Sequence, residues 1–524
     1  MSKSKPDQLE QEISAFLQSQ DAWGRDGAEI EMIETHVSRV FLNGTRVFKM
    51  KRHVRFPYLD FSSLDQRKQA CDAEFAINRR TAPDIYKGVQ PVTRDQDGKL
   101  YVDGPGSVVD WLVEMVQFDQ TTLFDRMAKN KQLDRHLMEK TAEVIALFHK
   151  EVTVVRGRGG QAGSSLIARN NNQSFAEVSD DILAFEQIDR LQILTDRILE
   201  DDGEILDSRR DIGLVRQAHG DMHLRNICLF EGKPTLFDAI EFNDDFAHID
   251  ILYDLAFLLM DLDCFGLRSL ANCVLNRYFD VSGGAMSDPE NFKVLPLFLS
   301  MRAAVRSHVD AAQARSLDDP ALRDERAQDA RNYLEMAVSY LQLTRPRLIA
   351  IGGLSGSGKS TLARDLAPEI GNAPGARIVR TDVTRKRLCG CPLDEKLGED
   401  GYTPEMNAQT YEAFYSEIQK CLNEGQSVIA DAVFARPGER ERVAEIARET
   451  DVAFQGLWID VSEQIMIERV TARLNDASDA DAEIVRQQQA YELGPMIWDR
   501  IDGSGMAEQT LQGAQLKTGE QKKT

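Results

Sequence analysis

A glycine-rich loop between an apolar segment and a helix-forming segment constrains this chain more than any other feature. Residues 353–360 read GLSGSGKS, after the apolar run RLIAIGG and before the segment STLARDLA. Glycines in such a loop let successive backbone N–H groups turn toward phosphate oxygens, and the helix that follows presents its positive N-terminal end. A chance glycine turn is the alternative, and the strand–loop–helix context argues against it.

Individual side chains of this loop have expected roles. Lys359 can reach the β- and γ-phosphates of ATP, and the hydroxyl of Ser360 can ligate Mg²⁺. Asp431 ends the buried segment SVIAD and can bind Mg²⁺ through water or organise an acceptor, with a structural cap as the alternative. The loop residues predicted to bind ATP are Gly353, Ser355, Gly356, Ser357, Gly358, Lys359, Ser360 and Thr361.

Strand and helix signals alternate after the loop. Strands are expected at 347–353, 378–382, 427–433 and 453–461, and helices at 405–423, 437–450 and 462–474. This alternation is typical of an α/β fold with a parallel sheet and helices on both faces. Pro346 ends the preceding helix, so we expect a domain boundary near 345 and an ATP-binding domain over 346–503. The Gly-, Gln- and Lys-rich residues 504–524 are expected to form a flexible tail.

The N-terminal part begins with β-rich segments. Residues 30–56 contain two such runs around Asn43-Gly44, which is a strong hairpin signal. A helix at about 65–80 follows, and then a strand pair between 88 and 118. Together these segments predict a small β-rich lobe over about 25–118.

Helices dominate the residues from about 119 to 345. One β-rich island at 226–242 interrupts them. A small β-rich lobe followed by a larger helical lobe is an α+β arrangement, which we expect to form one domain over 1–345.

The net charge and the cysteine content indicate which classes of partner and which cellular compartment to expect. The formal net charge is −22, and a surface this acidic repels nucleic-acid backbones and anionic lipid. We therefore expect neither nucleic acid nor a membrane as partner, and no apolar run reaches the length of about 18 residues that a membrane span needs. The seven cysteines and the lack of a signal-peptide core predict reduced thiols in the cytoplasm.

Charged side chains after the loop are candidates for the acceptor side of a phosphoryl transfer. Asp382 is expected at the carboxyl end of the strand 378–382, where it can orient or deprotonate an acceptor hydroxyl. Arg385 can hold an anionic part of the acceptor. Arg469 and Arg473, four residues apart, fit a mobile lid that brings cations to the phosphate. A helix cap and solvated surface arginines are the alternatives.

At these residues the C-terminal part resembles the small P-loop kinases, a group that includes gluconate and shikimate kinases, zeta toxins, chloramphenicol phosphotransferase and polynucleotide 5'-hydroxyl kinase. The resemblance covers about 347–500 and includes the pair Asp382-x-x-Arg385. It implies transfer of a phosphoryl group to an acceptor hydroxyl.

A second phosphoryl-transfer constellation lies at 219–238. The sequence His219-Gly-Asp221-Met-His-Leu-Arg-Asn226 is followed by Leu-Phe-Asp238. Phosphoryl transfer needs a carboxylate near the acceptor hydroxyl and Mg²⁺ ligands nearby. Asp221 can act as the base, and Asn226 and Asp238 can hold Mg²⁺ on the β-rich island. His219 is expected to buttress the loop.

This pattern resembles the aminoglycoside phosphotransferase family, which shares the protein-kinase-like fold. The resemblance implies a lysine on the third strand that contacts the ATP phosphates and a glutamate partner on the next helix. Lys49 is the preferred lysine, and Lys51, on the same strand face by period two, is the alternative. Glu74 is the expected partner, and Asp254 is expected to be structural. A glycine-rich loop over the phosphates is not evident, and an inactive relative is the alternative.

The order of the two domains resembles a group of bacterial proteins described as bifunctional phosphotransferase/ATP-binding proteins. We expect a phosphotransferase that uses Mg–ATP at two sites and acts on hydroxyl groups of small molecules. One alternative is a nucleotide-sensing regulatory protein in which one or both sites are non-catalytic. Another is a C-terminal polynucleotide 5'-hydroxyl kinase. The identity of the acceptors, the order of the reactions and the oligomeric state stay open.

Overall fold

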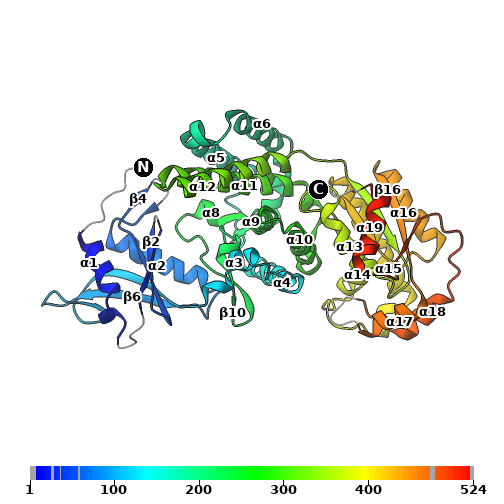
Figure 1. Cartoon of the computed structure of the whole chain (residues 1–524), viewed down its shortest axis with the longest axis horizontal. Helices are drawn as coiled ribbons and strands as arrows, with labels where there is room; N and C mark the ends of the chain where they lie inside the picture. Colours follow the sequence, from blue (N-terminus) through cyan, green and yellow to red (C-terminus); the bar gives the residue numbers. More distant parts are fainter. Residues whose placement is uncertain (1–7, 25–28, 36, 57–58, 473–477, 520–524) are drawn as a thin grey trace. The chain divides into compact units, whose positions relative to one another are not determined.

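The computed structural model describes residues 8–24, 29–35, 37–56, 59–472 and 478–519 (Figure 1). The chain forms two compact units. The first comprises residues 1–137, 151–159 and 215–254, and the second comprises 138–150, 160–214 and 255–524. Among the described residues, no helix is both long and apolar enough to cross a membrane.

A six-stranded antiparallel sheet forms the β-rich part of the first unit. Its strands, in spatial order, are β1 (Glu31–Glu34), β2 (Ser38–Leu42), β3 (Arg46–Lys51), β8 (Ser107–Val116), β6 (Tyr86–Arg94) and β7 (Leu100–Val102). The turn Asn43-Gly44 joins β2 to β3, which confirms the hairpin. The single run expected before this turn is divided in two, because Thr35 Oγ1 accepts the N–H of Ser38 and separates β1 from β2.

Helix α2 (Leu64–Asn78) packs on this sheet and places Glu74 in the protein interior. A capping box starts the helix. Ser63 Oγ accepts the backbone N–H of Gln66, and Gln66 Oε1 accepts the backbone N–H of Ser63. The expected helix at about 65–80 is thereby confirmed.

Two small antiparallel pairs surround the second predicted constellation. The expected β-rich island is the hairpin of β10 (Ile227–Phe230) and β11 (Lys233–Leu236). Strand β9 (Val215–Gln217) pairs with β12 (His248–Asp250). The segment 218–226 connects β9 to β10, so its ends are fixed by two different sheets.

Helices make up the part of the second unit that precedes residue 341. The longer ones are α5 (Gly160–Ile182), α6 (Phe185–Asp201), α10 (Arg268–Ser282), α11 (Leu295–Ser316) and α12 (Pro320–Tyr340). Helices α11 and α12 approach closely because Ser300 Oγ donates to the carbonyl of Ala337 at 2.7 Å. The β-rich sheet of the first unit and these helices confirm the α+β content expected for the N-terminal part.

A half-buried histidine of α11 makes the packing of these helices sensitive to pH. His308 Nε2 lies 3.2 Å from Asn171 Oδ1 on α5, and burial lowers the pKa of His308 to about 4. Since an unfolded histidine has a pKa of about 6.5, the unfolded chain takes up the proton first as the pH falls. The contribution of His308 to stability is therefore complete above about pH 6.5 and decreases as the pH falls toward 4.

The variant His308→Gln is expected to remove this part of the pH dependence. In the wild type, titration of His308 should lower the free energy of unfolding by about 2 kcal/mol between pH 6.5 and pH 5. Denaturant unfolding of both proteins at the two pH values measures the difference. Equal pH dependence in the variant and the wild type would contradict the prediction.

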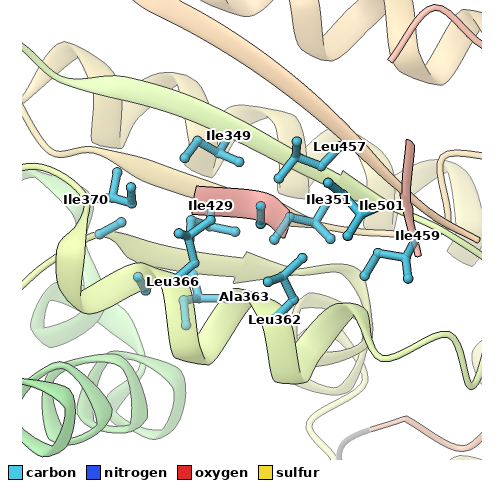
Figure 2. Close-up of a cluster of buried hydrophobic side chains, with 14 residues drawn as sticks. Ile349, Ile351, Leu362, Ala363, Leu366, Ile370, Ile429, Leu457, Ile459 and Ile501 are labelled. Atoms are coloured by element: carbon cyan, nitrogen blue, oxygen red, sulfur yellow. The ribbon is translucent and has the colours of Figure 1, made fainter. Parts of the chain in front are cut away.

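Five parallel strands form the sheet of the second unit, which confirms the α/β fold. In spatial order they are β14 (Arg377–Arg380), β15 (Val428–Asp431), β13 (Arg347–Gly352), β16 (Ala453–Asp460) and β17 (Asp499–Asp502). The helices between them include α13 (Lys359–Leu366), α14 (Thr381–Leu388), α15 (Pro404–Asn423), α16 (Pro437–Glu449), α17 (Glu463–Ala472) and α18 (Ala482–Gln489). Figure 2 shows Leu362 and Leu366 of α13 packed with Ile349 and Ile429 of the strands.

The C-terminal residues differ from the flexible tail expected over 504–524. Residues Ala507–Thr518 form helix α19, which lies beside α13 (Figure 1). Ala514 is part of the buried core, and Arg347 Nη2 donates to the carbonyl of Thr518 at 2.7 Å. The prediction of a flexible tail is wrong for this helix. Its sequence is mostly polar, and its buried face is too small to give a clear helical pattern.

Helix α10 covers the backbone of β14, the edge strand of the parallel sheet. Asn272 Nδ2 donates to the carbonyl of Ala376 at 3.0 Å. Asn276 Oδ1 accepts the N–H of Ile378 at 2.8 Å. Two side-chain amides thus make the hydrogen bonds that a neighbouring strand would otherwise make.

An ion-paired arginine strengthens the same contact. Arg377 of β14 is 1% exposed, and its Nη2 lies 2.6 Å from Asp280 Oδ1 of α10 and 2.9 Å from Glu417 Oε1 of α15. These contacts join α10 to the parallel sheet, so the compact units do not divide at the boundary expected near 345.

Candidate functional site

The glycine-rich loop lines a cavity of about 990 Å³. Three of its glycines have positive φ values, +148° at Gly353, +83° at Gly356 and +99° at Gly358, which favour glycine. Other parts of the cavity wall come from α14, α15 and α18. The predicted ATP-binding residues that line the cavity are Ser355, Gly356, Ser357, Gly358, Lys359, Ser360, Thr361 and Arg469.

Two polar groups of the glycine-rich loop form hydrogen bonds within the protein. The backbone N–H of Ser355 donates to Gln488 Oε1 of α18 at 2.7 Å. Lys359 Nζ donates to the carbonyl of Leu354 at 3.0 Å. An N–H group and an ammonium group that phosphate oxygens could engage are therefore held by protein oxygens in this conformation.

Gly356 is the loop position where a side chain is least compatible with the structure. A Cβ atom there would lie 2.5 Å from the carbonyl oxygen of Met466. We expect Gly356→Ala to weaken ATP binding at this site by about tenfold or more, because the N–H groups of the loop would be displaced. Calorimetric titration with a non-hydrolysable ATP analogue, in a Lys49→Ala background that weakens the N-terminal site, measures the effect.

The matched control for this prediction is Gly438→Ala in α16. A Cβ atom at Gly438 meets no atom within 4 Å. The control should bind the analogue with wild-type affinity. Wild-type affinity in Gly356→Ala as well would contradict the prediction.

The candidate metal position lies where the loop meets β15. Ser360 Oγ donates to Asp431 Oδ2 at 2.6 Å. Mg²⁺ is commonly bound through one or two protein oxygens, with phosphate oxygens and water completing its shell. The hydroxyl and the carboxylate fit this role. Arg380, which carried no prediction, also contacts both side chains.

Asp382, the predicted base, lines the same cavity as the glycine-rich loop. The sequence predicted that Asp382 ends the preceding strand. Instead, β14 stops at Arg380, and Asp382 belongs to the first turn of α14. A carboxylate is favoured in a first helical turn by the helix dipole. Burial and the charge of Asp431 raise the pKa of Asp382, against the opposing charge of Arg380.

Arg385 lies one helical turn after Asp382 and is 7% exposed. Its Nη1 donates to the carbonyl of Gly401 at 3.0 Å, and its Cζ lies 5.0 Å from the ring centre of Tyr402. Its Nε is buried and has no hydrogen-bond partner among the described residues, and Arg385 lines the cavity. A carboxylate or phosphate group of an acceptor could supply the missing hydrogen bond.

Only one of the two arginines expected on a lid, Arg469, lies among the described residues. Arg469 Nη1 donates to the carbonyl of Ser357 at 3.2 Å, and Nη2 donates to the carbonyl of Gly503 at 2.7 Å. In this conformation Arg469 braces the backbone of the loop. Arg473 lies outside the described residues.

Two further residues at this site lack a local sequence signal. Gln488 contacts the loop from a distant helix. Asp479 Oδ2 accepts the N–H of Leu397 at 3.0 Å and the hydroxyl of Tyr402 at 2.8 Å, and its Oδ1 lies 3.2 Å from Lys386 Nζ. The polar composition around Asp479 indicated only an exposed segment.

The second site is built around the loop that follows β9. Asp254, in α9 (Ile251–Cys264), accepts the backbone N–H groups of His219 and Gly220, both at 2.9 Å. His219 Nε2 lies 2.9 Å from the carbonyl of Phe237, and burial lowers the pKa of His219, which keeps the ring neutral. The structural role expected for Asp254 and the buttressing role expected for His219 are confirmed.

The predicted base and metal ligands lie close together in the first unit. Asn226 Nδ2 donates to Asp221 Oδ2 at 2.9 Å. Asp238 adopts a positive φ of +60° after β11, and its Oδ1 lies 2.6 Å from Lys49 Nζ. The amide oxygen of Asn226 and the carboxylate of Asp238 are ligand types that Mg²⁺ accepts.

Both candidate lysines contact Glu74. Lys49 Nζ lies 2.8 Å from Glu74 Oε1, and Lys51 Nζ lies 2.6 Å from Glu74 Oε2. Lys49 also contacts Asp238, whereas Lys51 donates a short hydrogen bond to Glu241. Burial alone would raise the pKa of Glu74, but the two lysine charges lower it to about 2. The contact with Asp238 places Lys49 nearer the candidate metal ligands.

A family model and several solved structures match parts of this chain. The family described as AAA domain matches residues 348–493. Among solved structures, a gluconokinase from Sinorhizobium meliloti 1021 is 21% identical, with a TM-score of 0.23 over 34% of this chain and 97% of that chain. A putative aminoglycoside phosphotransferase from Ralstonia eutropha is 13% identical, with a TM-score of 0.37 over 64% of this chain and 99% of that chain.

Two mycobacterial relatives match almost the whole chain. Uncharacterized protein Rv2004c of Mycobacterium tuberculosis and Uncharacterized protein Mb2027c of Mycobacterium bovis are each 30% identical to it over 492 residues. The alignments cover 92% of this chain and 94% of each relative, and so include both the α+β part and the P-loop part. The chain therefore belongs to the protein family of Rv2004c and Mb2027c.

Proposed function

We propose that this protein is a bifunctional ATP-dependent phosphotransferase that acts on hydroxyl groups of small molecules at two Mg–ATP sites. The observation that carries the proposal is that Asp382 and Arg385 line the same cavity as Lys359 and Ser360 of the P-loop. Phosphoryl transfer to a hydroxyl needs a carboxylate and a phosphate-binding loop within one cavity. ATP hydrolysis alone would not account for a buried guanidinium N–H on the acceptor side.

At the P-loop site, ATP would supply the phosphoryl group, and Mg²⁺ would offset the charge on the phosphate oxygens. Lys359 and the loop N–H groups bind the phosphates, while Ser360 and Asp431 hold the metal ion. Asp382 takes the proton of the acceptor hydroxyl on its carboxylate. Arg385 binds an anionic group of the acceptor and thereby orients the hydroxyl.

At the N-terminal site, Asp221 takes the proton of its own acceptor hydroxyl. The hydrogen bond from Asn226 fixes the orientation of that carboxylate. Asn226 and Asp238 hold Mg²⁺. Lys49 binds phosphate oxygens, and its ion pair with Glu74 positions the ammonium group for this contact.

An acceptor screen with two point variants tests the proposal. The full chain would be incubated with ATP labelled in the γ-phosphate and with sugars, sugar acids, polyols, nucleosides and aminoglycosides. We expect Asp221→Asn to abolish one class of phosphorylated product and Lys359→Met to abolish another. Each variant should keep the product that the other loses.

Other outcomes of the screen refute specific parts of the proposal. Nucleotide binding without turnover at one or both sites would favour the regulatory alternative. If the label is transferred only to short oligonucleotides with a 5'-hydroxyl group, the acceptor of the P-loop site is a polynucleotide and not a small molecule. Unchanged products in both variants would show that the sites are assigned to the wrong residues.

A further inference from the structure

Three side chains converge at the candidate metal position of the P-loop site. Ser360 Oγ donates to Asp431 Oδ2 at 2.6 Å. Arg380, the last residue of β14, donates from Nη2 to Ser360 Oγ at 3.0 Å and from Nε to Asp431 Oδ2 at 3.2 Å. The side chain of Asp431 is 4% exposed and that of Arg380 is 13% exposed, so water screens their charges little.

The hydrogen bonds of Ser360 and Asp431 define what a metal ion would share with Arg380. A serine hydroxyl has one O–H bond and two lone pairs. Its proton is directed to Asp431, and one lone pair accepts the N–H of Arg380. The second lone pair is left for a Mg²⁺ ion, but the ion would also need the negative charge of Asp431, for which it competes with Arg380. Two cations this close in a shielded site also repel each other.

We propose that Arg380 is a tethered counter-cation of the P-loop metal site. It holds Ser360 and Asp431 in their ligand arrangement before Mg–ATP binds, and it leaves these two side chains when the metal ion binds. The inference rests on the proposed function in one respect, namely that this site takes Mg–ATP.

This arrangement makes metal binding depend on the nucleotide. A free divalent ion has to displace a guanidinium group and gains one carboxylate in return. The phosphates of ATP bring further negative charge, which stabilises the metal ion and the displaced guanidinium together. Arg380 thus makes the site select the metal–nucleotide complex over the free ion.

Binding of Mn²⁺ without nucleotide, measured by electron paramagnetic resonance on the full chain, tests the proposal. We expect Arg380→Gln to tighten Mn²⁺ binding at this site by about tenfold or more, because it removes the competing charge. The double variant Arg380→Gln/Asp431→Asn should lose the gain, which separates this site from Asn226 and Asp238. The control Arg500→Gln makes the same charge change at a side chain that is 59% exposed and should bind Mn²⁺ like the wild type.

Two results would overturn the proposal. One is a Mn²⁺ affinity of Arg380→Gln equal to or below that of the wild type. The other is a gain that persists in the double variant. If thermal unfolding shows that Arg380→Gln does not fold, Arg380→Met fills the same space without charge and carries the same expected gain.

The experiment also separates this inference from the proposed function. Tighter Mn²⁺ binding in a chain that transfers no phosphoryl group would support the role of Arg380 and refute the phosphotransferase. Phosphoryl transfer with unchanged Mn²⁺ affinity in Arg380→Gln would support the phosphotransferase and refute the role of Arg380.

Discussion

Replacing Asp382 with asparagine is expected to lower phosphoryl transfer at the P-loop site by about 10²- to 10⁴-fold, the usual contribution of a general base. Asparagine has nearly the same shape, but its amide cannot take a proton from the acceptor hydroxyl. If Asp382 serves the acceptor as proposed, binding of ATP should stay close to the wild-type value, because Lys359 and Ser360 of the phosphate-binding loop are unchanged. The loss should therefore be seen in kcat rather than in nucleotide affinity.

The pH profile of the wild type gives an independent measure of this role. A base has to be ionised, and burial raises the pKa of Asp382 above its ordinary value. The rate should fall with decreasing pH at a higher pH than is typical of an exposed aspartate. Initial rates from acid to neutral pH should show this acid limb in the wild type and lose it in the residual activity of Asp382→Asn.

A matched control exists in the same domain. Asp451 lies in an exposed turn with a φ of +52°, a conformation that asparagine also adopts. Asp451→Asn should keep both the rate and the pH profile. Undiminished transfer in Asp382→Asn would exclude this carboxylate as the base.

Replacing Arg377 with alanine is expected to destabilise the second unit by about 3–5 kcal/mol, since it removes the cation beside Asp280 and leaves Glu417 with Arg387 alone. Asp280 Oδ1 lies 2.6 Å from Arg377 Nη2, and Glu417 Oε1 lies 2.9 Å from it. The guanidinium also donates from Nη1 to the carbonyl of Asn276 at 3.2 Å. This effect should exceed that of any exposed arginine in the domain, because exposed pairs contribute about 1 kcal/mol or less.

Chemical denaturation of the full chain, followed by tryptophan fluorescence and circular dichroism, measures this destabilisation. Arg500→Ala is the control, because its partner Asp460 is 42% exposed and remains hydrated when the pair is lost. Midpoints that differ little between Arg377→Ala and Arg500→Ala would show that the buried pairs do not hold β14.

The sequence predicted most elements that carry a strong local signal. The glycine-rich loop located the first strand of the parallel sheet, β13, which ends just before it. Its glycines are a clear signal because the loop needs backbone angles that are available mainly to glycine. The Asn43-Gly44 turn and the β-rich island that begins at Asn226 were also found from short-range signals. The choice between Lys49 and Lys51 could not be made from period two alone, because both side chains lie on the same face and both contact Glu74.

Features that depend on distant residues were missed or misplaced. Asp382 was assigned to a strand end because residues 378–382 were interpreted as one strand, whereas α14 already begins at Thr381. Helix α19 was taken for a tail because its buried face is small. Arg380 and Gln488 act through contacts with partners 20 to 133 residues away in the chain, which leave no periodic pattern.

The asparagine contacts on β14 have a consequence for dividing this protein into fragments. A fragment that starts at Arg347 would lack Asn272 and Asn276, and the N–H of Ile378 and the carbonyl of Ala376 would lose their partners. An uncovered outer strand is a template on which another chain can add its own strand. We expect such a fragment to self-associate through β14, whereas one that also includes α10 would start with that strand already shielded.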